Sequence, residues 1–99
     1  MPDHPLKVFE ELDPELLNLV EDTRKLALDE GALPRRFKLL IAMALDASHG
    51  TVEGVKALAH AALQAGATKE EIRETLRVAQ FISGVGCVYT AAHALKELF

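Results

Sequence analysis

The sequence predicts an all-α domain, a compact bundle of about five helices. Apolar residues recur at helical spacing through most of the chain, and no segment of alternating polar and apolar residues indicates a strand. Residues that start and stop helices stand between these segments, among them Asp-Pro, Thr-x-x-Glu and isolated glycines. The 99 residues suffice for one domain. We expect an N-terminal lead-in at 1–12 and a helical domain at 13–99.

The first long helix follows a lead-in that contains a short turn of helix around Lys7–Leu12. We expect Asp13 to be its N-cap, with Pro14 at the first helical position. The helix runs to about Glu30 and ends at Gly31, a residue suited to a left-handed C-terminal conformation. One side of this helix is apolar, and it consists of Leu16, Leu17, Val20, Ala27 and Leu28.

Two helices follow in the middle of the chain. The helix at about 34–48 contains LLIAMAL and is apolar on all sides, which predicts a central helix covered by its neighbours. Gly50 ends this pattern, and a helix at about 51–65 follows, closed by Gly66. Its inward stripe is predicted to be Val52, Val55, Ala59, Ala62 and Leu63.

The last two helices are marked by their starts. Thr68 and Glu71 form a capping box, which predicts a helix that runs to about Ile82. The segment SGVG at 83–86 interrupts it, and a last helix begins at Cys87 and runs to the C-terminus.

Composition restricts the partners. Apolar residues make up 49% of the chain, more than a small helical monomer easily hides, so we expect self-association. The net charge of −4 and the scattered lysines and arginines argue against a nucleic-acid partner. The longest apolar run, Leu39–Leu45, is too short to cross a membrane, and the N-terminus lacks an apolar signal core. We therefore expect a cytoplasmic protein.

Several phrases carry a family resemblance: GALP, FKLLIAMALDASHG, HAALQAGATKEEI and VAQFISGVG. Their order and spacing resemble the carboxymuconolactone decarboxylase family, which includes the alkyl hydroperoxidase D-like proteins. The resemblance covers residues from about 13 to 99. It implies a helical protomer of that fold that assembles into trimers or hexamers.

The redox branch of this family has a CxxC motif followed by a histidine. Aligned on Gly66, the resemblance puts the two cysteines at Thr51 and Gly54 and the histidine at Leu58. An upstream glutamate falls on Leu39 and a relay histidine on Glu53. The three motif positions lie on one helix face, where a base could activate the thiol that attacks peroxide. Because this chain has Thr, Gly and Leu there, peroxiredoxin-type activity is disfavoured.

The family's other named activity, decarboxylation of a carboxylated lactone, needs no redox cysteines. Such a reaction needs a cationic group for the acid and a general acid that protonates the resulting carbanion. His49, Glu53 and His60 are candidate catalytic groups, with His60 as proton carrier and Glu53 as the residue that orients it. Candidate substrate-binding residues are Arg35, Arg36 and Tyr89. This hypothesis is a cofactor-free lyase on a small carboxylated lactone.

The alternative is a non-catalytic, oligomeric binding or scaffold protein of the same family. On that interpretation, the helix face with His49, Glu53, Lys56, His60 and Gln64 is simply solvated. The surroundings of Leu58 distinguish the two hypotheses: an open cavity reached by Glu53 or a histidine favours an enzyme, and a filled contact favours a scaffold.

The sequence has one cysteine, Cys87, so an intramolecular disulfide cannot form. Its place at the start of a helix would suit a reactive thiolate, but a free cysteine is more often a small buried hydrophobe. No histidine or cysteine spacing resembles a metal motif, so we expect neither a metal site nor a cofactor.

Overall fold

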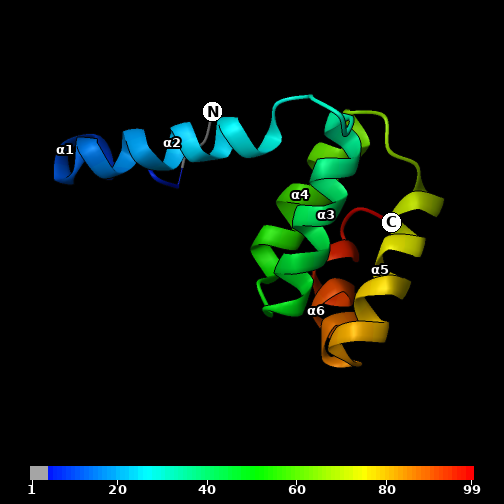
Figure 1. Ribbon diagram of the computed structural model, residues 1–99. Helices are drawn as coiled ribbons and strands as arrows, with labels where there is room; N and C mark the ends of the chain where they lie inside the picture. The colour runs from blue at the N-terminus through cyan, green and yellow to red at the C-terminus, as the bar shows by residue number, and fades with distance from the viewer. Residues whose placement is uncertain (1–4) are drawn as a thin grey trace.

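The computed structural model describes residues 5–99, so residues 1–4 of the predicted lead-in lie outside the described residues. The described chain is all-α, as predicted, and contains one short helix and five longer ones (Figure 1). In chain order the helices are α1 (Phe9–Leu12), α2 (Pro14–Leu28), α3 (Arg35–Ser48), α4 (Val52–Gln64), α5 (Lys69–Ser83) and α6 (Gly86–Leu95).

The hydrophobic core lies among α3, α4, α5 and α6. α3 packs against the three other helices of this body, and α4 and α5 also pack on α6. Leu39, Met43 and Val55 are the largest fully buried side chains. Alanines fill much of the remaining core and let the helices approach closely; they include Ala47, Ala59, Ala62, Ala91 and Ala94.

α2 extends away from this body, and none of its residues is buried (Figure 1). Its start is as predicted, because the Asp13 carboxylate accepts a hydrogen bond from the Leu16 backbone N–H at 3.0 Å. The predicted end was wrong. The helix stops at Leu28 because Asp29 adopts an extended conformation (ψ 144°), and Gly31 is not among the glycines with positive φ.

α3 begins one residue later than predicted, with Pro34 as its N-cap. The expectation that its neighbours cover it on all sides was also wrong. Ile41 and Leu45 remain 49% and 56% exposed, whereas Leu39 and Met43 on the opposite side are buried. The apolar sequence of this helix thus fills the core with one side and leaves the other open.

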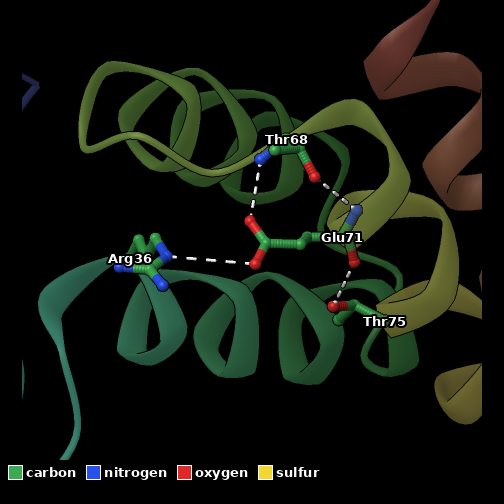
Figure 2. A network of polar contacts seen from close by, with 4 residues as sticks. All are labelled: Arg36, Thr68, Glu71 and Thr75. Atoms are coloured by element: carbon green, nitrogen blue, oxygen red, sulfur yellow. Dashed lines mark hydrogen bonds and ion pairs between the residues drawn. The ribbon is translucent and has the colours of Figure 1, made fainter.

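Two glycines with positive φ, Gly50 and Gly66, separate the middle helices as predicted. The predicted capping box at the start of α5 is present: the Thr68 hydroxyl accepts from the Glu71 backbone N–H, and the Glu71 carboxylate accepts from the Thr68 backbone N–H (Figure 2). Gly84 ends α5, also with positive φ. α6 ends at Leu95, so the last helix stops short of the C-terminus.

Candidate functional site

The positions predicted for the redox motif lie on α4 and at its N-cap. Thr51 is the exposed N-cap of this helix, Gly54 is half-buried in its first turn, and Leu58 packs half-buried against the hydrophobic core. A Cβ atom at Gly54 would lie 2.1 Å from Asp46 Oδ2 and 2.9 Å from Asp46 Cγ. The Asp46 side chain therefore fills the space in which a second cysteine would stand. Leu39, at the position of the upstream glutamate, is buried in the core.

A hollow of about 300 Å³ lies on the neighbouring face of α4. We call it the α4 hollow; it is lined by Glu53, Lys56, Ala57, His60 and Leu98. Its four helical members lie at i, i+3, i+4 and i+7, so α4 presents them on one side. Leu98 comes from the chain after α6 and adds an apolar wall. The hollow thus combines a carboxylate, an ammonium and an imidazole with apolar surface.

Lys56 forms an ion pair with Glu97, which also belongs to the segment after α6. The hydrogen bond that Lys56 donates to Glu97 raises the pKa of the lysine, the Glu97 charge raises it further, and the Glu53 carboxylate adds a smaller effect. The same hydrogen bond lowers the pKa of Glu97. Lys56 is therefore a cation that is paired with Glu97 and also lies in the electric field of the Glu53 carboxylate.

Two of the three candidate catalytic residues, Glu53 and His60, line the α4 hollow. They lie two helical turns apart, with Lys56 and Ala57 between them, so they stand towards opposite ends of the hollow. His49 does not line it: this residue is the exposed C-cap of α3.

The candidate substrate-binding residues lie elsewhere. Arg36 Nε is 3.9 Å from Glu71 Oε2, and its guanidinium lies over the Phe37 ring, so this arginine joins α3 to the start of α5 (Figure 2). Arg35 Nη1 donates to the Leu28 carbonyl at 3.4 Å at the base of α2. Tyr89 is exposed on α6. None of the three lines the α4 hollow.

Sequence reasoning did not name three of the five residues that line the hollow as site residues, Lys56, Ala57 and Leu98. Lys56 lay on the polar face of the predicted helix, and its i+3 spacing from Glu53 was the signal that could have identified it. Leu98 had no such signal, because only the turn after α6 brings it to α4.

Cys87 is 3% exposed and packs in the core, as a small hydrophobe would. Within residues 5–99, no three His, Cys, Asp or Glu side chains gather in a way that could hold a metal ion. None of the helices in this range is both long enough and apolar enough to span a bilayer.

Comparison with known proteins agrees with the resemblance found in the sequence. The family model described as "Carboxymuconolactone decarboxylase family" matches residues 14–97, from the first residue of α2 to the segment after α6. Neither the curated proteins nor the solved structures yield a significant match to the chain.

Proposed function

Because the chain belongs to the carboxymuconolactone decarboxylase family, we propose that it is a cofactor-free lyase that removes carbon dioxide from a small carboxylated lactone in the α4 hollow. One observation carries this proposal: Glu53, Lys56 and His60 line the same hollow beside the apolar Ala57 and Leu98. A carboxylated lactone has matching parts, an anionic group and a carbonyl on a largely apolar ring.

The reaction breaks the bond between the ring carbon and the carboxylate. Carbon dioxide leaves, and the electron pair is delocalised from the ring carbon through the ring double bond onto the lactone carbonyl group. A cation helps most where this negative charge develops, and the Lys56 ammonium is the cation of the hollow. The neighbouring carboxylates favour the charged form of Lys56, so it keeps this charge over a wide pH range.

His60 supplies the proton that the resulting delocalised carbanion takes up. Imidazole is the side chain suited to carry a proton near neutral pH, and His60 lines the hollow. Because Glu53 lies two turns from His60, its role differs from the one expected from sequence. Its charge acts on Lys56, one turn away, and favours the protonated form of that lysine.

The test is release of carbon dioxide from carboxymuconolactone by the purified protein. We expect turnover in the wild type and, in Lys56→Met, a lower kcat together with a higher KM, because this variant lacks the cation that stabilises the developing negative charge. Glu97→Gln is the matched control, because it removes the ion pair and keeps the ammonium; its KM should stay near that of the wild type. The lyase proposal is wrong if the wild type releases no more carbon dioxide than a protein-free sample.

A second candidate function is a non-catalytic binding or scaffold protein, and the packing of Leu58 favours it. Leu58 makes a filled contact with the core rather than lining an open cavity. A scaffold of this kind would bind carboxymuconolactone no more tightly in the wild type than in Lys56→Met, and it would assemble without turnover. Calorimetric titration of both proteins with this lactone separates the two functions.

For either function we propose a cytoplasmic homo-oligomer, a trimer or hexamer as the family resemblance implies. Sixteen large apolar side chains are exposed on the described chain, which supports association. Light scattering in dilute solution should give a mass well above the 10.8 kDa of one chain. A mass near 10.8 kDa would contradict the assembly and leave the lyase proposal untouched.

A further inference from the structure

The segment formed by α1 and α2, residues 9–28, is an arm with an unpartnered apolar stripe. Leu16, Leu19, Val20 and Leu26 of α2 are 39–83% exposed. At 100° per residue these four positions fall within about 120° of the helix circumference, so they form one stripe. We call it the arm stripe. The half-buried Leu17 and Leu28 lie on another side of the helix.

The base of the arm is fixed to the body of the protein. Arg35 Nη1 and Lys38 Nζ donate to the carbonyls of Leu28 and Asp29 at 3.4 and 2.6 Å, and Leu28 packs against the core. Beyond this base the arm projects into solvent (Figure 1). A lone helix of about 15 residues is marginally stable in water, so a helix with this stripe needs a partner to cover it.

The body of the protein carries a second exposed apolar surface, across the end of α5 and the start of α6. We call it the α5–α6 patch; its members are 42–82% exposed and comprise Val78, Phe81, Ile82, Val85, Val88 and Tyr89. A groove of about 280 Å³ runs beside it, lined by Arg73, Leu76, Arg77, Gln80 and Val88. The patch and groove together offer a surface on which an amphipathic helix can lie.

The charges of the two surfaces are complementary. Residues 9–23 of the arm include six carboxylates and no lysine or arginine. Glu15 and Asp22 are seven residues apart and border the arm stripe on one edge. Arg73 and Arg77 border the groove, and neither forms an ion pair within residues 5–99.

From these observations we propose that the arm of one copy of this chain docks on the α5–α6 patch of a second copy. The arm stripe covers Phe81 and its apolar neighbours, while Glu15 and Asp22 face Arg73 and Arg77. The inference rests on the assembly proposed above and names the contact that produces it.

The arm does not dock on the patch of its own chain. The arm and α5 lie on opposite sides of α3 and α4 (Figure 1), and the base contacts hold the arm in that direction. The two surfaces of one contact therefore come from different copies, which makes the interface heterologous. Contacts of this kind close into rings when the rotation between copies closes and form open filaments when it does not, so a cyclic trimer is one assembly that this contact can build.

A mixing experiment tests the docking. Leu16→Lys/Leu19→Lys disables the arm stripe and Phe81→Lys disables the patch; the altered side chains are exposed, so both proteins should keep the wild-type helical circular dichroism. Each variant alone should be monomeric. Their mixture should give a one-to-one dimer of twice 10.8 kDa, because one intact arm can still meet one intact patch.

Each other outcome identifies what is wrong. A monomeric wild type overturns both the assembly and the docking. An arm variant that stays oligomeric overturns the docking alone. If both variants are monomeric and the mixture stays monomeric as well, an intact arm does not bind an intact patch, and the docking is overturned.

Charge reversal tests the orientation of the contact. Arg73→Glu/Arg77→Glu and Glu15→Arg/Asp22→Arg should each weaken association about tenfold or more, and the protein with all four changes should regain it. Glu21→Arg is the matched control, because Glu21 lies on a side of α2 away from the arm stripe; it should associate like the wild type. If the protein with all four changes associates as weakly as the two double variants, the proposed pairing is overturned.

Discussion

Replacement of Gly54 by alanine tests whether Asp46 closes the position of the second redox cysteine. Glycine within a helix costs about 0.5–1 kcal/mol relative to alanine, so an unobstructed substitution should stabilise the protein by that amount. Here the new Cβ would lie 2.1 Å from Asp46 Oδ2, and 3.0 Å from Thr51 Cγ2. Asp46 must rotate away, and a side chain displaced from its rotamer costs about 0.5–1.5 kcal/mol.

These two effects nearly cancel in the wild type, so Gly54→Ala should change the free energy of unfolding little or lower it. In an Asp46→Ala background the obstructing carboxylate is gone, and the same substitution should stabilise by about 0.5–1 kcal/mol. The coupling between the two positions should therefore be about 0.5–1.5 kcal/mol.

The assay is urea unfolding of the four proteins, followed by circular dichroism at one protein concentration because assembly makes apparent stability concentration-dependent. Gly31→Ala is the control, since a Cβ there would meet nothing within 4 Å and should have equal effects in both backgrounds. If Gly54→Ala stabilises the wild type and the Asp46→Ala protein equally, Asp46 does not obstruct the position. A cysteine at residue 54 would face the same carboxylate, so a restored redox motif requires a second change at Asp46.

Three further predictions concern stability and reactivity. Thr68→Ala removes the hydroxyl acceptor of the capping box, so it should lower the free energy of unfolding by about 1 kcal/mol and the thermal midpoint by about 4–8 °C. Thr68→Ser keeps the hydroxyl and should unfold like the wild type. Equal midpoints for Thr68→Ala and Thr68→Ser would contradict the role of the cap. Glu97→Gln should lower the melting temperature near neutral pH. The pKa of Glu97 is lowered, so the stability contributed by the Lys56–Glu97 pair is lost as pH falls below the ordinary carboxyl range. The pKa of Lys56 is raised, so the same contribution is lost as pH rises above the ordinary lysine range. If the melting temperatures of Glu97→Gln and the wild type differ by the same amount from about pH 3 to about pH 11, the ion pair is not the cause of the difference. This interval spans the ordinary pKa values of glutamate and lysine, about 4.3 and 10.4. Cys87 is buried, so it should react with a thiol reagent only on unfolding, and the protein should not consume peroxide with a dithiol donor; turnover that disappears in Cys87→Ser would overturn this.

Local features of the fold could be predicted from the sequence because their determinants lie within a few residues. The Asp13 cap and the capping box of Thr68 and Glu71 each join positions three residues apart. The end of α2 was missed because a glycine such as Gly31 indicates where a helix can stop, not where it must. Asp29 leaves the helix first, and its carbonyl accepts from Lys38 on the next helix.

Long-range arrangement could not be predicted in the same way. The apolar pattern of α2 predicts a side that needs covering, but the pattern is the same whether the cover comes from this chain or from another. For α3, the pattern did not distinguish the buried Met43 from the exposed Ile41. Periodicity gives the apolar faces of a helix, and the fold of the whole chain decides which of them are covered.

Of the candidate site, the sequence predicted only residues that belong to α4. Helical spacing placed Glu53 and His60 on one face, and both line the hollow. His49 belongs to the end of α3, and Arg36 meets Glu71 across a gap of 35 positions in the sequence. Contacts between distant segments of this kind leave no periodic signal.

The turnover of His60→Ala relative to His93→Ala tests the proposed lyase most directly. Both histidines are exposed on helices, but only His60 lines the α4 hollow. With carboxymuconolactone as substrate, loss of the proton donor should reduce kcat about 100-fold or more in His60→Ala, and His93→Ala should match the wild type. Equal kcat values for the two variants would contradict the assignment of His60 as the proton donor and with it the proposed chemistry of the hollow.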